Sequence, residues 1–297
     1  MSFYEIRIKD ISDIFGLNFP EYWIFRGQEK DWVLKSSIER LFDELNYDYY
    51  WLNDSEWNIE EVFTEKFKQK TECGINSRIE CRALMQHYGM PTRLLDFTKS
   101  LLVALYFVTE NYDKSDCDGI VWALNLAQLY KCHVEGGRVI NVNKGDSEEV
   151  RTEYTSRTIT NIGRLFPMVI PVDLHDEHLE KNARFKNQKG KFLMPLKGCG
   201  FEKSLYDSFN LCRSNKQEMS FQNFERNFLE TKLIKFIIFQ KNKKALSSSL
   251  NKIGINKEFL FSDDNDCWAP KFREICIELK EEFIKKELEG RNILCRK

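Results

Sequence analysis

Several familiar functional motifs are missing from this chain of 297 residues. It has no phosphate loop of the form GxxxxGKS/T, no GxGxxG, no HExxH and no GxSxG. These absences exclude the usual signatures of ATP hydrolases, Rossmann dehydrogenases, zinc proteases and serine hydrolases. Any activity must therefore come from a less common arrangement of side chains.

An excess of charge is also absent. The 45 basic and 46 acidic residues give a net charge of −1, so no global field attracts nucleic acid or an anionic membrane. No window approaches ~18 uninterrupted apolar residues, and the start "MSFYEIRIKD" is charged where a secretory signal is apolar. The 9 cysteines include no CxxC pair, as expected of reduced thiols. We expect a cytoplasmic protein without membrane contact, whose oligomeric state the sequence leaves open.

Proline and glycine, at 6 and 14 residues, form no hinge-like cluster. We predict a single domain over 1–297, with a motif-bearing core at about 20–200 and a strand and helix extension over 201–297. Apolar runs predict strands at 21–28, 118–126, 166–172, 190–196 and 233–240. Residues 31–42 are expected to form a loop that runs into a short helix. Periodic patterns predict helices at 59–73, 77–89, 217–232 and 244–254, and from 270 onward.

Residues 100–112 are apolar enough for a buried helix, although a strand remains an alternative. Strands and helices alternate without a regular βαβ order. This pattern favours an α+β fold with a mixed or antiparallel central sheet, flanking helices and a C-terminal helical extension.

The first polar segment of interest is "FRGQ", residues 25–28. Arg26 closes an apolar strand, where its planar fork of donors can bind a phosphate or carboxylate. Gly27 lets a ligand or another backbone come close. The alternative is a buried structural ion pair for Arg26.

The second segment, "QHYGMPTRLLDFTKS", gathers His87, Tyr88, Arg93 and Asp96 before an apolar run. If this stretch is helical, Arg93 and Asp96 face each other and form a structural pair. Thr98 or Ser100 caps the following helix, whose N-terminus favours an anion. Capping explains one hydroxyl and leaves the remaining polar residues as candidates for a site.

The third segment, "ARFKNQKGKF", places Arg184 and Gln188 before Gly190 and a predicted strand. A polar turn without function is the alternative. Elsewhere, His175 and His178 have a spacing that would suit a metal, but a solvated acidic loop explains "DLHDEHLE" equally well. We predict no metal site.

Together these segments resemble the FRG domain, a family of mostly bacterial proteins named for its (F/Y)RG motif. The matching segments are "FRGQ" at 25–28, "QHYGMPTRLLDFT" at 86–98, "ALYF" at 104–107, "DGIVWAL" at 118–124, "ARFKNQKGKF" at 183–192 and the later "KFIIF…LFSDD". The likeness extends over about residues 20–275.

A looser resemblance is to arginine-type ADP-ribosyltransferases. In those enzymes a strand ending in Arg-Gly is followed by a Ser-Thr-Ser-like strand, and then by a Glu before a late strand. The resemblance implies that Arg26 grips the diphosphate or ribose of NAD, while Thr98 and Ser100 hold the nicotinamide ribose. Gln188 then stands where the catalytic Glu belongs, and Asp96 or Glu153 supplies the missing negative charge.

This resemblance implies an NAD-binding domain that transfers ADP-ribose to a protein or nucleic-acid acceptor, or hydrolyses NAD, within a bacterial toxin or anti-phage effector. The alternatives are a non-catalytic nucleotide sensor and a nucleic-acid-processing protein. The implied catalytic residues are Arg26, Asp96 and Gln188, and the implied ligand-binding residues are Gly27, Gln28, His87, Tyr88, Arg93, Thr98, Ser100 and Arg184. Arg26, Asp96, Thr98 and Gln188 must then converge on one cleft. The site assignment is wrong if Arg26 and Gln188 lie on opposite faces of the sheet.

Overall fold

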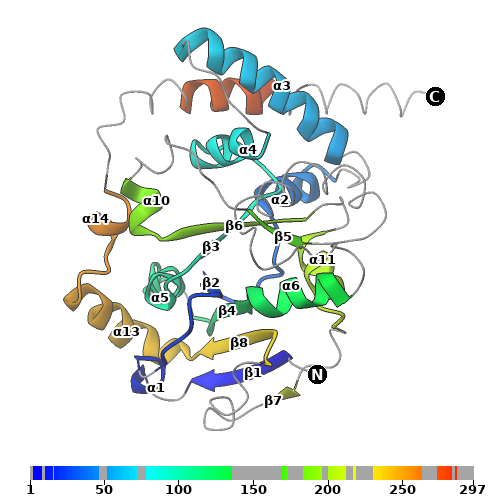
Figure 1. Ribbon diagram of the computed structural model, residues 1–297. Helices are drawn as coiled ribbons and strands as arrows, with labels where there is room; N and C mark the ends of the chain where they lie inside the picture. Colours follow the sequence, from blue (N-terminus) through cyan, green and yellow to red (C-terminus); the bar gives the residue numbers. More distant parts are fainter. Residues whose placement is uncertain are drawn as a thin grey trace.

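The computed structural model describes most of the chain. The described residues are 3–8, 11–15, 17–46, 52–71, 78–114, 116–135, 169–172, 183–195, 200–211, 217–218, 230–262, 273–282 and 285. Within them, eight strands form one mixed sheet in the order β5-β6-β3-β2-β4-β8-β1-β7 (Figure 1). Helices cover both faces of this sheet.

The central strands are those that the sequence predicts. They are β2 (Trp23–Gln28), β4 (Gly119–Asn125), β6 (Gly190–Pro195) and β8 (Leu233–Ile238), and all of their contacts with one another and with β3 (Leu95–Thr98) are antiparallel. Residues 169–172 of the predicted strand at 166–172 form β5 (Val169–Val172), at the edge beside β6. The α+β prediction with a mixed sheet is confirmed at this level.

Three strands were not predicted from apolar runs: β3 and the two strands described next. β1 (Phe3–Ile8) lies between β8 and β7 (Gln217–Glu218) and is parallel to both. The predicted helix at 217–232 is wrong at both ends, because residues 217–218 pair with β1 and residues 230–232 are not helical. Residues 219–229 lie outside the described part. The C-terminal third therefore contributes the inner strand β8 as well as helices.

One face of the sheet packs against α5 (Leu101–Thr109), α13 (Gln240–Lys252) and α14 (Lys257–Leu260). The other face packs against α6 (Leu126–Glu135) and α11 (Phe201–Ser208). Phe25, Val121 and Phe236 belong to the first core, and Ile24, Trp122 and Leu233 to the second, as strand alternation requires. Residues 100–112 thus contain a buried helix.

The remaining helices are α1 (Ile11–Phe15), α2 (Ser37–Glu44), α3 (Leu52–Thr71), α4 (Arg78–His87) and α10 (Ala183–Asn187), and residues 273–282 are also helical. In Figure 1, α3 and α4 lie together beyond the β6 end of the sheet. Gly89, at φ 92°, follows α4 and adopts the left-handed backbone that commonly ends a helix. None of the helices in the described ranges is long and apolar enough to cross a membrane.

Gly27 is fixed by the packing of α5 on β2. A Cβ atom added at residue 27 would lie 1.9 Å from the carbonyl oxygen of Ala104 and 3.1 Å from Cβ of Phe107. Any larger residue would push α5 away from the strand. The glycine of the Arg-Gly pair therefore admits the backbone of a helix, one of the two explanations that the sequence offered.

Candidate functional site

A pocket of about 300 Å³ opens where β2 and β3 meet. These strands share a single residue pair, Phe25 with Thr98, whereas β2 and β4 share six. The pocket is lined by Phe25, Arg26, Gly27, Gln86, His87, Asp96, Phe97, Thr98, Phe107, Arg184, Phe185, Gln188, Gly190, Lys191 and Phe192. Its volume is at the lower end for sites that bind small organic ligands.

Arg26 stands at the centre of this arrangement. Its Nη1 donates to the backbone carbonyl oxygen of Asp96 at 2.7 Å, across the gap between β2 and β3. Its Nε is buried and has no hydrogen-bond partner among the described residues. Burial lowers the pKa of Arg26, and Arg40 adds to the lowering, while Asp96 opposes it. A partly buried cation whose buried Nε donor is unused is suited to bind an anionic group.

The pocket draws on both faces of the sheet. Arg26 pairs with Trp122 and so starts on the face of that residue, whereas Thr98 pairs with Phe25 and starts on the opposite face. The expectation that the site residues share one side of the sheet is therefore wrong for Arg26. The predicted convergence is still met, because Arg26, Asp96, Thr98 and Gln188 all line the pocket at the gap.

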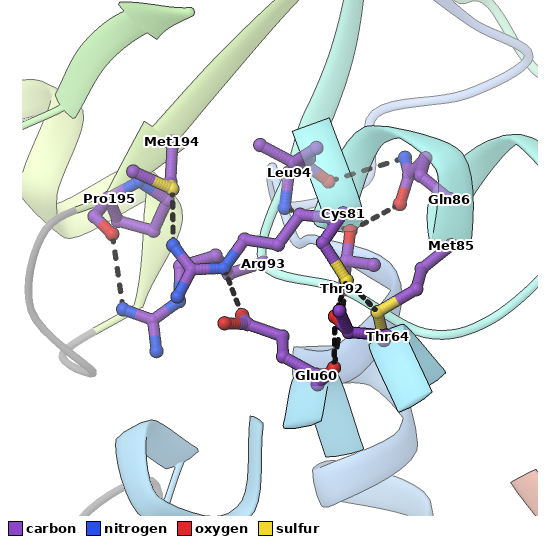
Figure 2. Close-up of polar contacts among 11 residues, drawn as sticks. Glu60, Thr64, Cys81, Met85, Gln86, Thr92, Arg93, Leu94, Met194 and Pro195 are labelled. Carbon is purple, nitrogen blue, oxygen red and sulfur yellow. Dashed lines mark hydrogen bonds and ion pairs between the residues drawn. The ribbon is translucent and has the colours of Figure 1, made fainter. Parts of the chain in front are cut away.

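Asp96 is an exposed residue of β3 and is held from α4. Its Oδ2 accepts a hydrogen bond from Nε2 of Gln86 at 2.8 Å. The helical pairing of Arg93 with Asp96 does not occur, because Asp96 lies in a strand. Arg93 is buried outside the pocket, and its Nη1 donates to the carbonyl oxygen of Pro195 at 3.5 Å (Figure 2).

The two hydroxyl residues have structural contacts. Thr98 Oγ1 donates to the carbonyl oxygen of Gln188 at 2.6 Å and accepts from the amide of Ser100 at 3.0 Å. Ser100 is the N-cap of α5 and accepts from the amide of Val103. Thr98 lines the pocket and Ser100 does not. Of the two candidates for the cap, Ser100 is therefore the one used.

Arg184 and Gln188 belong to a second wall, which residues 257–262 support. Gln188 Nε2 donates to the carbonyl oxygen of Leu260 at 3.1 Å, so its amide nitrogen is engaged. The guanidinium of Arg184 lies 4.8 Å from the ring centroid of Phe261. Burial lowers the pKa of Arg184 and Asp96 opposes this effect. The segment at 183–187 is a short helix, and a turn leads from it into β6.

Three predicted ligand residues remain to be placed. His87 lines the pocket, with its ring edge-on to Tyr88, which is buried beside it. Gln28 is buried and accepts from Nε1 of Trp122 at 3.0 Å, a structural contact. Tyr88 and Gln28, like Arg93 and Ser100, are not among the pocket residues.

The sequence analysis missed two polar residues of the pocket. Gln86 contacts Asp96 directly, and Lys191 is buried within the apolar strand β6. A lysine inside an apolar strand is a signal that could have been noticed, since buried lysines are rare. The pocket also has aromatic walls, built from Phe25, Phe97, Phe107, Phe185 and Phe192. Three cationic residues and flat apolar surfaces together suit a ligand that carries both an anion and a planar ring.

Metal ligands do not gather in the described part of the chain: no group there holds three or more His, Cys, Asp or Glu side chains suited to an ion. The histidines of "DLHDEHLE" at 173–180, which offered the alternative of a metal site, lie outside the described residues. Glu153, an alternative source of negative charge, lies outside them as well.

Comparison with known proteins identifies one family. Residues 21–117 match the family model of the FRG domain. The match includes Arg26, Gln86, Asp96 and Thr98 and ends before Arg184 and Gln188. No curated protein and no solved structure matches the chain.

Proposed function

We propose that this chain, which carries an FRG domain, binds NAD or a related nucleotide in the pocket between β2 and β3 and cleaves its nicotinamide–ribose bond. The observation that carries the proposal is the meeting of three distant segments at one pocket. The pocket is lined by Arg26, Asp96 and Gln188, and the first and last of these are more than 160 positions apart in the chain. These segments stand in the order that resembles arginine-type ADP-ribosyltransferases, and the proposal extends that likeness to the type of fold.

The proposed roles follow from charge. Arg26 and Arg184 bind the diphosphate, because both are partly buried cations at the pocket. Lys191 adds a third positive charge. The phenylalanine walls contact the nicotinamide and adenine rings through stacking or edge contacts. Thr98 and Gln188, which also line the pocket, contact ribose hydroxyls in this proposal.

In the proposed reaction the C–N bond between ribose and nicotinamide breaks, and its electron pair leaves with nicotinamide, which departs as a neutral molecule. The ribose is left as an oxocarbenium cation. Asp96 stabilises this developing charge, as a preorganised carboxylate does in a partly enclosed site. Water or a hydroxyl or amine of an acceptor then attacks the ribose carbon and releases one proton to Asp96 or to solvent. Water gives NAD hydrolysis, and a macromolecular acceptor gives ADP-ribosylation.

A non-catalytic nucleotide sensor is the second candidate. It is favoured by the amide at residue 188, which brings no charge and already donates to Leu260. The two candidates predict the same binding and differ in turnover. Either activity would suit a bacterial toxin or anti-phage effector, a context that rests on association rather than on the pocket.

The test is to incubate the pure protein with NAD, follow nicotinamide release, and measure NAD and ADP-ribose binding by calorimetry. Arg26→Ala is expected to weaken binding at least about tenfold, the effect of losing one charge-assisted contact. Arg7→Ala, an exposed arginine of β1, is the matched control and should bind normally. Binding without release supports the sensor. Neither binding nor release overturns the NAD proposal, and RNA and DNA cleavage should then be assayed.

A further inference from the structure

Asp96 is the one carboxylate among the described residues that line the pocket. Its Oδ2 accepts from Gln86 Nε2 at 2.8 Å, and no contact with another described residue is recorded for its Oδ1. Asp96 projects from a four-residue strand and is itself exposed, so packing does little to fix its side chain. Among the described residues, the hydrogen bond from Gln86 is therefore the direct contact of this carboxylate, to which the charges of Arg26 and Arg184 add electrostatic attraction.

Gln86 is in turn held behind the pocket by hydrogen bonds with Thr92 and with the carbonyl oxygen of Leu94, to which its Nε2 donates at 3.4 Å (Figure 2). Its Oε1 accepts from Thr92 Oγ1 at 2.6 Å and from Ser37 Oγ at 3.3 Å. Thr92 Oγ1 accepts from the amide of Leu94 at 3.2 Å, and the amide of Thr92 donates to Ser37 Oγ at 2.9 Å. Thr92 is completely buried, so this network is part of the core.

The network fixes which way the amide of Gln86 points. If the amide were flipped, Oε1 would lie against Oδ2 of Asp96, two acceptors in contact. The hydroxyl groups of Thr92 and Ser37 stabilise the observed orientation by donating to Oε1. The result is a chain of hydrogen bonds that starts at the buried Leu94 amide and ends on a carboxylate at the pocket.

We propose that Gln86 is the positioning residue for Asp96, an inference that rests on the proposed cleavage of NAD. An amide is the side chain that this role requires. It donates a hydrogen bond without adding charge, so the carboxylate keeps its negative charge for the oxocarbenium. A lysine or arginine would neutralise that charge, and a glutamate would repel it.

The test compares Gln86→Met with the parent protein. Methionine keeps the length of the side chain and removes both the donor and the acceptor. We expect kcat for nicotinamide release to fall about 10- to 100-fold, the size of effect that misplaced catalytic groups produce. KM for NAD should change less than about threefold, because Gln86 acts through Asp96 rather than on the nucleotide. Thr92→Val, which removes the strongest bond to Oε1, should lower kcat in the same direction by a smaller factor.

A double-mutant cycle separates positioning from general damage. In the Asp96→Asn background, Gln86→Met should lower kcat no further. Gln188→Met is the matched control, because it makes the same chemical change at the other glutamine of the pocket, which donates to Leu260 instead. Its effect should be equal in both backgrounds. Equal losses from Gln86→Met in both backgrounds overturn the inference.

A spectroscopic measurement keeps the inference testable if Gln86→Met does not fold or if the protein releases no nicotinamide. The side-chain amide protons of Gln86 are assigned by NMR in the parent protein and in Asp96→Asn, which alters an exposed residue only. A charge-assisted bond should shift them, and the substitution should remove that shift while the amide of Gln188 stays unchanged. An unchanged Gln86 amide refutes the positioning role. Absent release refutes only the proposed function.

Discussion

The pocket has two walls, and each uses a glutamine amide in a different way. On the α4–β3 wall, made by α4 and β3, Gln86 Nε2 donates to the side chain of Asp96 at 2.8 Å. On the α10–α14 wall, made by α10, its following turn and residues 257–262, Gln188 Nε2 donates to the backbone carbonyl of Leu260 at 3.1 Å. The first amide orients a carboxylate and also donates to the carbonyl oxygen of Leu94 at 3.4 Å, whereas the second connects two segments of the chain.

This difference explains the amide at residue 188. Asn187 beside it also donates to the segment, to the carbonyl oxygen of Phe259 at 2.7 Å and to Ser262 Oγ at 3.0 Å. Two neighbouring amides thus hold residues 259–262. A glutamate at 188 would set a carboxylate against the carbonyl of Leu260, where it has no proton to donate. The departure from the transferase pattern is consistent with a structural requirement at this position.

The largest difference between the walls should appear when their charged residues are removed. If the proposed cleavage occurs, Asp96→Asn should lower kcat for nicotinamide release about 100-fold or more with little change in nucleotide affinity, because it removes the negative charge that the proposed transition state needs. Arg184→Met should instead weaken ADP-ribose binding about tenfold, because it removes a partner of the diphosphate. Steady-state kinetics beside calorimetry measure both effects.

The opposite result, a loss of binding from Asp96→Asn and a loss of turnover from Arg184→Met, would contradict the assignment of chemistry to one wall and binding to the other. If Asp96→Asn binds poorly and turns over normally, Asp96 belongs to binding rather than to chemistry. The control is Lys66→Met, which removes a surface ion pair between Lys66 of α3 and Glu278. It should leave kcat and ADP-ribose affinity unchanged, because surface ion pairs contribute little.

A smaller effect is expected on the free energy of unfolding when Gln188 is replaced. Gln188→Met should cost about 1 kcal/mol, the usual loss for one hydrogen bond. Gln188→Glu should cost more, since it also introduces repulsion, and it should not increase nicotinamide release. Thermal unfolding and amide hydrogen exchange over residues 257–262 measure the change. A clear gain in release from Gln188→Glu would show instead that this position lacks only its carboxylate.

The smallest effect concerns alkaline pH and the α10–α14 wall. The Tyr106 ring lies 6.4 Å from that of Phe261, and burial, with a smaller contribution from Glu110, raises the pKa of Tyr106 to about 12. In the unfolded chain tyrosine ionises near 10. The protonated phenol therefore contributes stability that is complete below about pH 10 and is lost as pH rises towards 12. Urea unfolding at pH 8 and 11 should show a smaller alkaline loss in Tyr106→Phe; an equal loss would assign the effect to other groups.

The sequence predicts the fold well where local patterns decide it. The strands at 23–28, 119–125, 190–195 and 233–238 combine apolar or β-branched residues with turn signals. β1 was missed because "FYEIRI" carries Glu5 and Arg7, and its parallel partners lie far along the chain, so no hairpin turn marks it. The short strand β7 likewise exists through its pairing with β1.

Predicting the pocket was harder, because contacts between segments decide which polar residues reach it. Thr98 and Ser100 both carry a hydroxyl group just before α5, yet Ser100 caps the helix and Thr98 donates to the Gln188 carbonyl. Gln86 looks like an ordinary polar residue at a helix end, and its role requires the chain reversal after Gly89 that brings Asp96 beside it. The aromatic lining cannot be told from core residues by sequence alone.

Arg26 connects β2 to β3, in addition to the ligand-binding role proposed for it. The carbonyl of Asp96 accepts from a guanidinium rather than from an amide of β2, so a side chain stands in for one step of the ladder between the strands. The same guanidinium is the cation that would receive an anionic ligand. A ligand that binds Arg26 competes with the Asp96 carbonyl for its donors. The affinity of the pocket for an anion then depends partly on the free energy needed to break this contact between β2 and β3.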